Sequence, residues 1–430
     1  MNKEVFVFIG PAEIAGFYTN LNKGLLELGY NSNYLGIDYY SKKYQIHKNE
    51  IFFIKFYKRV KNFIIQRNLK GQKIFYLNYL IKVLYILIFL TLIFKANILI
   101  FGFNSSLFPK KWDFPIWKFF KKKLIVCCFH GAEIRPPFLD GVNNLKNNNF
   151  ISSNEIKILI NSKIKEIRKA EKYASVIVAA PTNCHYLTRP FINIFQIGLA
   201  VDASRILSNE YFNQRKDDNL VFVHAPSSMM TKGTEIIREA INELKKTYKI
   251  DYIELTGLNV KQVYEKIIIA DLVIDQVYSD TPMAGLATEA SALGVPTLVA
   301  GYELSNIISN FIPNFLCPPT LICKPYEIKD KLEYLINNQN VLKQVGIKCE
   351  DFVKTKWCYL EVANRFTKLF TENIPNEWYL NPQRIEYVSG AGLSKLKRDK
   401  IVYDFINKYG EKALGLNDKN TNRLLNDLAL

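Results

Sequence analysis

Four short segments combine glycine with polar or charged side chains, each directly after a run of apolar residues. They are Gly10–Gly16 (GPAEIAG), Phe129–Pro137 (FHGAEIRPP), His224–Thr234 (HAPSSMMTKGT) and Asp280–Pro296 (DTPMAGLATEASALGVP). In open parallel sheets, ligands bind beyond the carboxyl ends of the strands. These segments therefore hold the candidate binding and catalytic residues.

The third and fourth segments each lead into a predicted helix, which suits them to phosphate binding. Lys232 lies next to the expected helix start at Gly233, and Pro282 and Gly285 flank another helix start. The first N–H groups of a helix lack partners within the helix, and the helix dipole attracts anions. We predict that these starts cradle a diphosphate, and a solvated lysine at position 232 is the alternative.

Glu289 is a carboxylate in a segment otherwise suited to burial, because Ala, Leu and Gly surround it. An ionised carboxylate in such surroundings is costly unless it is paired. Two ribose hydroxyls would be a suitable bidentate partner. A nearby lysine or a backbone amide is the alternative partner.

His130 follows a predicted strand and precedes a glycine, so its imidazole has little steric cover. Such an imidazole can contact sugar hydroxyls or shuttle protons, and a packed histidine is the alternative. Gly10 and Gly16 let the backbone approach a ligand, or form an ordinary turn. Neither GxGxxG nor the P-loop spacing is present, which argues against a nicotinamide dinucleotide site and a P-loop.

The elements that position these residues follow from apolar runs that alternate with amphipathic patterns. Strands are predicted at Val5–Ile9, Ile98–Phe101, Leu124–Phe129, Ser175–Ala179, Leu220–His224, Tyr252–Leu255, Leu272–Val277 and Thr297–Ala300. Helices are predicted at Phe17–Leu28, Glu155–Tyr173, Gly233–Leu244, Val260–Ala270 and Ala284–Leu293. Strands separated by helices predict parallel, doubly wound sheets.

The length of 430 residues suits two domains plus a tail. We predict an α/β protein with two Rossmann-like domains that face a cleft, residues 1–205 and 206–370, the first on the acceptor side. Residues 371–430 form a helical or partly flexible tail. The polar stretch 209–219 lies near the domain junction.

The seven cysteines form no CxxC pair, and no His or Cys spacing suggests zinc. We expect buried or free thiols in a reducing compartment. The first residues lead directly into a predicted strand, so we expect no secretory signal.

Residues 41–123 hold 18 Lys or Arg and two acidic residues, so this segment carries +16 of the net +17. It also holds 20 aromatic residues. Together with long apolar runs, this favours an anionic membrane surface; a solvated basic face and a nucleic-acid site are the alternatives. Only 12 uncharged residues lie between Lys82 and Lys95, so we expect a buried or interfacial helix rather than a membrane-spanning helix.

Taken together, residues 1–370 resemble the GT-B glycosyltransferases, especially the large retaining group called family 4. The resemblance is clearest at His224–Thr234 (HAPS…KGT), at Ile267–Asp275 (IIIADLVID) and at Thr288–Val299 (TEASALGVPTLV). It implies a hexosyltransferase that needs no bound metal and no cofactor, with the nucleotide-sugar as donor substrate. Lys232 would contact the diphosphate, Glu289 the ribose and His130 the transferred sugar. Gly10 and Gly16 would lie in a loop that closes beneath the donor.

One position departs from this pattern. Family members often carry two glutamates with seven residues between them, and the first would fall at Thr281, with Asp280 beside it as a substitute. The candidate catalytic residues are thus His130, Asp280 and Thr281. The candidate nucleotide-sugar-binding residues are Gly10, Gly16, His224, Lys232, Gly233, Ala284, Gly285 and Glu289.

The leading hypothesis is a bacterial glycosyltransferase of polysaccharide biosynthesis, peripheral on the inner face of the plasma membrane and acting on a cell-surface glycan or lipid-linked acceptor. A nucleotide-sugar epimerase of the same fold and a non-catalytic scaffold are the alternatives. We expect Glu289→Ala and Lys232→Ala to abolish nucleotide binding with little loss of stability.

Overall fold

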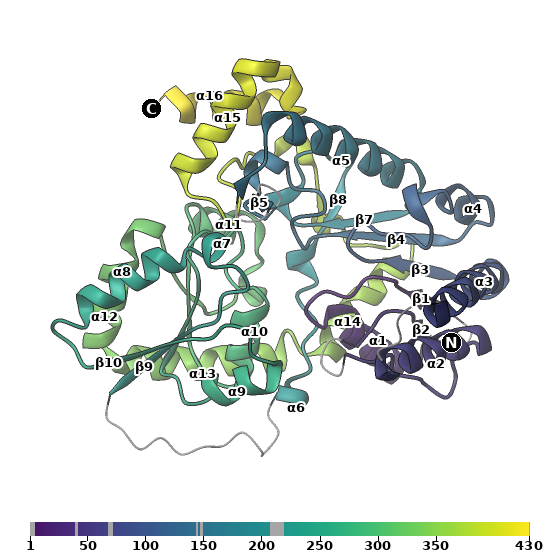
Figure 1. Cartoon of the computed structure of the whole chain (residues 1–430), viewed down its shortest axis with the longest axis horizontal. Helices are drawn as coiled ribbons and strands as arrows, with labels where there is room; N and C mark the ends of the chain where they lie inside the picture. The colour runs from purple at the N-terminus through teal and green to yellow at the C-terminus, as the bar shows by residue number, and fades with distance from the viewer. Residues whose placement is uncertain are drawn as a thin grey trace.

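In a computed structural model, the chain forms two α/β domains, each built on its own sheet (Figure 1). The structure describes residues 5–38, 42–67, 72–142, 145–146, 149–206 and 219–429. Residue 41 and residues 68–71 of the basic segment, and residues 209–218 of the polar stretch, lie outside the described residues. The predicted class, two doubly wound α/β domains, is confirmed.

The first domain has a seven-stranded sheet in the order β14-β8-β7-β4-β3-β1-β2. Its strands are β1 (Phe6–Ile9), β2 (Asn31–Tyr34), β3 (Ile98–Phe101), β4 (Lys123–Cys128), β7 (Val176–Ala179), β8 (Phe191–Asn193) and β14 (Tyr379–Leu380). All neighbouring strands are parallel except β14, which pairs antiparallel with β8. The carboxyl ends of the parallel strands therefore meet at one edge.

The second domain has a five-stranded parallel sheet in the order β10-β9-β11-β12-β13. Its strands are β9 (Leu220–His224), β10 (Ile250–Glu254), β11 (Leu272–Gln276), β12 (Thr297–Ala300) and β13 (Leu321–Cys323). Successive residues of β9, such as Phe222 and Val223, are both fully buried but belong to different apolar clusters. The sheet is thus covered on both faces, as the continuous apolar runs predict.

Helices cover both sheets. Those packed with the first sheet are α1 (Phe17–Glu27), α2 (Phe52–Arg67), α3 (Gln72–Lys95), α4 (Phe114–Phe119) and α5 (Ser153–Tyr173). After the short α6 (Ala203–Ile206), those of the second domain are α7 (Met229–Lys232), α8 (Thr234–Leu244), α9 (Val260–Ile267), α10 (Gly285–Ala292), α11 (Leu304–Phe311), α12 (Ile328–Asn337) and α13 (Gln339–Thr355). The predicted helix from Gly233 begins one residue later, because Gly233 adopts a left-handed conformation between α7 and α8.

The chain returns to the first domain before residue 370. Helix α14 (Tyr359–Thr367) packs against α1, and a Cβ on Gly24 would lie only 2.5 Å from the Cβ of Ala363. Only glycine allows the two helices to approach this closely. The structure therefore places residues 359–370 on the first domain rather than with the second, where the sequence pattern placed them.

The tail contacts both domains. Helix α15 (Lys395–Tyr409) packs against α5 and α16 (Asp418–Ala429) follows it, as Figure 1 shows at the top of the view. Before α15, the N–H of Ala391 donates to Leu139 O in the first domain, and that of Gly392 donates to Tyr278 O in the second. The tail thus contains helices and ties the two domains together.

Candidate functional site

A cavity of about 230 Å³ lies between the two domains, at loops that follow the carboxyl ends of their strands. Six of the candidate residues line it: His130, Asp280, Thr281, Ala284, Gly285 and Glu289. Two segments separated by about 150 residues in sequence thus meet at one site. Gly10, Gly16, His224, Lys232 and Gly233 do not line this cavity.

The start of α10 faces the cavity and the first domain. Its N-cap residue, Ala284, offers no side-chain hydrogen bond to the first backbone N–H groups of the helix. A Cβ on Gly285 would lie 3.5 Å from the Cβ of Ala15, which belongs to the loop between β1 and α1. The uncapped helix end is therefore available to an anion held between the two domains.

Glu289 lies one turn further along α10, on the same side as Gly285. Burial raises the pKa of its carboxyl to about 7, the Tyr264 hydroxyl opposes this shift by hydrogen bonding, and Asp275 adds to it by repulsion. The structure contains no lysine bound to this carboxylate among its described ion pairs. The described residues therefore do not support the alternative in which a lysine pairs with Glu289.

Lys232 is held away from the cavity wall. Its ammonium donates to Asp275 Oδ1 at 3.1 Å and to Gln276 Oε1 at 2.8 Å. The side chain of Asp275 is completely buried, so removal of Lys232 would leave a buried carboxylate without its cation. With this contact we expect Lys232→Ala to lower stability, in place of the small effect expected from the sequence. A diphosphate would have to draw the ammonium from Asp275.

His224 has a structural environment. Its ring is completely buried, Nδ1 lies 2.7 Å from Ile274 O, and Nε2 lies 2.9 Å from the Thr234 hydroxyl. Because both ring nitrogens already have partners, His224 has no free polar atom for a nucleotide-sugar. The prediction that His224 contacts the nucleotide-sugar is therefore wrong. Its side chain has a structural role instead, because its hydrogen bonds join β9 to β11 and to α8.

His130 lies on the opposite wall, after β4. Its Nε2 is 3.0 Å from the Tyr18 hydroxyl, and Phe17 and Phe129 pack edge-on or tilted against its ring. Burial lowers the pKa of His130 to about 3, so the imidazole is neutral at physiological pH. A neutral imidazole can hydrogen-bond a sugar hydroxyl but is a poor proton shuttle near pH 7.

The loop after His130 is fixed by charge. Arg135, which is 7% exposed, donates through Nη2 to Asp280 Oδ2 and lies 3.6 Å from Asp140. Asp280 belongs to the second domain, so this ion pair bridges the cleft. Asp280 is thus already engaged, which leaves it less free to take the place of the absent glutamate. A separation of 145 residues explains why sequence patterns did not reveal this pair.

Lys163 of α5 supports the same loop from behind. Its ammonium donates to the carbonyl oxygens of Ala132 at 2.6 Å and Arg135 at 2.7 Å. Burial lowers the pKa of Lys163 to about 8. Both His130 and Arg135 therefore sit on a loop whose backbone is anchored to a helix of the first domain.

The β1–α1 loop is shaped by a residue that the sequence patterns did not single out. The carboxylate of Glu13 accepts from the backbone N–H of Thr19 at 2.8 Å and from the hydroxyl of Tyr34 at 2.9 Å. Gly16 has φ 79° at the start of α1, and Ile14 and Ala15 beside it line the cavity. The loop thus contacts the cavity through Ile14 and Ala15 rather than through Gly10 or Gly16.

Two asparagines of the first domain were also missed. Asn20 and Asn183 line the cavity, each is 1% exposed, and the Oδ1 atom of each has no hydrogen-bond partner within the described residues. Buried amide oxygens without partners are rare and costly. These side chains could be satisfied by hydroxyl groups of a bound ligand after a small rotation.

The described ranges contain no group of three or more His, Cys, Asp or Glu side chains that could hold a metal ion. All seven cysteines are free in this structure, and four of them are buried. Burial raises the pKa of Cys127 to about 12, so its thiol is unreactive. Independence of metals stays a prediction.

Gly131→Ala tests how tightly the His130 loop is built. Gly131 has φ 108°, and a Cβ there would lie 2.6 Å from Nη2 of Arg135. We expect a loss of about 2–3 kcal/mol in the free energy of unfolding, from strain and displacement of the guanidinium. Chemical denaturation measures this loss. Gly257→Ala is the control, because Gly257 has φ 70° but no atom within 4 Å of the added Cβ. Equal losses at the two sites would contradict the packing argument.

Comparison with known proteins gives similarity in fold only. No family model and no curated protein matches the chain. Among solved structures, Anabaena Alr3699/HepE in complex with UDP-glucose is 10% identical, with 85% of this chain and 98% of that chain covered and a TM-score of 0.47. A glycosyltransferase from Rickettsia africae is 13% identical, with 87% and 100% covered and a TM-score of 0.48. MurG from Acinetobacter baumannii is 10% identical, with 85% and 99% covered and a TM-score of 0.38.

The fold is that of a GT-B protein: two Rossmann-like domains whose strand ends face one cleft. This agrees with the fold that the sequence resemblance implies. The residue assignments rest on the geometry of this chain.

Proposed function

We propose that the protein is a glycosyltransferase that moves a sugar from a nucleotide-sugar donor to a glycan or lipid-linked acceptor. The observation that carries the proposal is the position of Gly285 and Glu289 on one side of α10, both at the wall of a cavity whose other wall holds His130. Four residues of helix span about 6 Å. This spacing suits adjacent parts of one nucleotide, the diphosphate at the helix end and the ribose at the carboxylate.

The transferred sugar would lie towards the first domain. The neutral imidazole of His130 and the amides of Asn20 and Asn183 offer hydrogen bonds to hydroxyl groups without adding charge. Positive charge would come from the uncapped start of α10 and from Lys232 once a phosphate displaces its contact with Asp275. These groups would stabilise the diphosphate as it leaves.

We propose retention of the anomeric configuration, as the resemblance to family 4 implies, and the lining of the cavity fits it. An inverting transfer needs a side-chain base near the acceptor hydroxyl. Among the described residues of the lining, Asp280 is bound to Arg135, Glu289 is assigned to the ribose, and His130 is too weak a base at neutral pH. In the retaining course that we propose, the departing phosphate oxygen accepts the proton of the acceptor hydroxyl while that hydroxyl oxygen bonds to the anomeric carbon on the same face. The anomeric proton signals of the product in NMR distinguish the two outcomes.

Donor binding is tested first by thermal shift. We expect one member of a panel of UDP, GDP, ADP, CMP, UDP-glucose and GDP-mannose to raise the melting temperature, since a ligand at 100 times its Kd stabilises by about 2.7 kcal/mol. Lys232→Met should weaken this response and also lower the unliganded melting temperature. Lys343→Met, at an exposed position of α13, is the matched control. A panel without any response contradicts the proposal.

Transfer is tested with the responding donor. Purified protein is incubated with that donor and with lipid extracted from bacterial membranes, and glycosylated products are separated and identified by mass. Conversion of the donor sugar without acceptor would indicate an epimerase instead. Donor binding with neither transfer nor conversion would favour the non-catalytic scaffold.

A further inference from the structure

Helix α3 has apolar side chains on two opposite sides. One side is buried in the core of the first domain, with Ile81, Leu84, Ile88 and Leu92 at most 9% exposed. The other side carries a stripe of exposed apolar residues, which begins with the adjacent Phe75 and Tyr76 and continues at spacings of three or four through Tyr79, Val83, Ile86, Leu90 and Phe94. Phe75 is 71% and Phe94 81% exposed. A helix with this distribution needs a second apolar partner.

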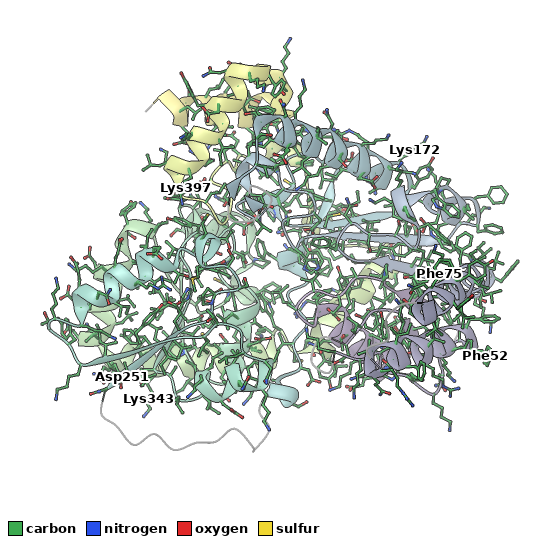
Figure 2. The ribbon with its side chains drawn as sticks, viewed as in Figure 1. Phe52, Phe75, Lys172, Asp251, Lys343 and Lys397 are labelled. Atoms are coloured by element: carbon green, nitrogen blue, oxygen red, sulfur yellow. The ribbon has the colours of Figure 1, made fainter. Side chains whose placement is uncertain are left out.

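The stripe continues onto neighbouring elements. On α2, Phe52, Phe56 and Phe63 are exposed. On the other side, Trp112 is 49% exposed and packs edge-on against Phe89 of α3 with ring centroids 6.1 Å apart. Figure 1 shows α2, α3 and α4 on the flank of the first domain that lies away from the second domain, and Figure 2 shows Phe52 and Phe75 on that flank.

Basic side chains adjoin the end of the stripe. The backbone N–H of Lys123, at the start of β4, donates to the carbonyl oxygen of Asn97. Asn97 follows the last residue of α3 by two positions, so the start of β4 lies beside the end of α3. A surface hollow of about 400 Å³ lies there, lined by Lys118, Lys121, Lys122, Lys123, Lys172 and Arg189, with Glu372 as its acidic member. Phe119 is 79% exposed beside these lysines. Apolar and cationic groups therefore share one continuous flank.

We propose that this flank binds the surface of an anionic lipid bilayer, with α3 lying in the plane of the interface. Exposed Phe, Leu, Ile and Val side chains would enter the acyl boundary, and the lysines would face anionic headgroups. A second copy of the chain is the poorer partner, because each copy carries +17 and the flank is its most basic part. This binding is additional to the proposed sugar transfer and does not depend on it.

The same contacts explain why α3 lies on the bilayer rather than across it. Residues Phe75–Lys95 are long and apolar enough to cross a membrane, and one third of the most apolar window is buried within the protein. To span, α3 would have to withdraw Ile81, Leu84 and Ile88 from the core of the first domain and expose β-sheet surface. An interfacial position leaves that core intact and still covers the stripe.

The test is sedimentation of the full chain with vesicles. Vesicles of phosphatidylcholine with 30% phosphatidylglycerol are compared with pure phosphatidylcholine vesicles between 0.05 and 0.5 M NaCl. We expect binding to the anionic vesicles that weakens as salt rises, and at least about tenfold less binding to the neutral ones. Equal binding to both, or binding to neither, overturns the proposal.

Variants test whether vesicle binding depends on the stripe or on exposed apolar residues anywhere on the surface. Ile86→Asn with Leu90→Asn removes two exposed apolar groups from the stripe, and vesicle binding should fall at least about tenfold. Ile158→Asn with Ile347→Asn removes two exposed isoleucines from α5 and α13 and should change binding less than twofold. Similarly, Lys121→Glu with Lys122→Glu should abolish the preference for anionic vesicles, whereas Lys343→Glu with Lys397→Glu, on the other flank in Figure 2, should not.

Light scattering after gel filtration addresses the second-copy alternative. A monomer that binds anionic vesicles supports the proposal. A dimer that the stripe substitutions dissociate, together with absence of vesicle binding by the parent chain, overturns it. Circular dichroism of each variant checks that the fold is retained. The substituted side chains are exposed, except that Lys122 is half-buried.

Discussion

Glu289→Gln is expected to abolish the nucleotide-dependent thermal shift while making the unliganded protein more stable above pH 7. The carboxylate would accept two hydroxyl groups of the ribose, and glutamine replaces one acceptor oxygen by a donor. Hydrogen bonds to a charged group contribute about 1.5–3 kcal/mol each, so donor affinity should fall about 10- to 100-fold or more. Isothermal calorimetry with the responding nucleotide measures this loss.

The stability part follows from the pKa of Glu289. Burial raises the pKa from 4.5 to about 7, so between these values the folded chain holds a proton that the unfolded chain has lost. The favourable contribution of this proton is complete below about pH 4.5 and disappears as pH rises through 7. Glutamine does not ionise, so the parent should lose melting temperature between pH 5 and pH 8 relative to Glu289→Gln.

We expect the variant to melt about 3 °C higher than the parent at pH 8 and within about 1 °C of it at pH 5. Glu239→Gln, at an exposed position of α8, should show neither the binding loss nor the pH-dependent gain. If Glu289→Gln binds nucleotides as well as the parent, the carboxylate is not a ligand-binding group. If it melts lower at pH 8, the interactions of the carboxylate within the protein, such as that with Tyr264, outweigh the cost of its burial.

Arg135→Met is expected to be the most destabilising single substitution at the site. It leaves Asp140, which is completely buried, and Asp280 without the guanidinium that lies between them. Removing one partner of a buried ion pair costs about 3–5 kcal/mol. Because Arg135 and Asp280 belong to different domains, calorimetry should also show earlier and less cooperative unfolding.

A second substitution isolates the contact between the domains. Asp280→Asn in the Arg135→Met background removes one of the two carboxylates that have lost the guanidinium, so it should recover part of the lost stability. In the parent background the same Asp280→Asn should destabilise. Arg238→Met is the control, since Arg238 lies at the surface and pairs with the exposed Glu235 and the half-buried Glu254, and surface ion pairs contribute little to stability. Additive effects of the two site substitutions would show that Arg135 and Asp280 do not interact in solution.

Some elements escaped prediction because their sequences lack a local signal. Strand β2 reads Asn-Ser-Asn-Tyr, without the apolar residues that mark a buried strand. It is nevertheless buried, because Ser32 donates to Asn22 Oδ1 at 2.7 Å and Asn33 accepts from the N–H of Ile51 at 2.9 Å. Partners that lie 10 and 18 residues away cannot be inferred from the period of the segment itself.

The amino-acid sequence by itself determined the two doubly wound domains, the strand ends at which polar residues gather, and the basic-aromatic character of residues 41–123. These features are encoded locally, since apolar period, helix starts and charge are properties of neighbouring residues. Glu289 was identifiable for the same reason: its apolar neighbours lie beside it in sequence. Its place at the cavity wall follows from the helical spacing between Gly285 and Glu289.

Only the tertiary structure decided how these residues are used. In the folded protein Asp280 pairs with Arg135 and Lys232 with Asp275, and both ring nitrogens of His224 have hydrogen-bond partners. It also returned the chain to the first domain at α14 and closed the tail over both domains. Each of these contacts joins groups that are ten to more than two hundred residues apart, and the free energy of burying a charge or a polar atom depends on which distant group the fold brings beside it.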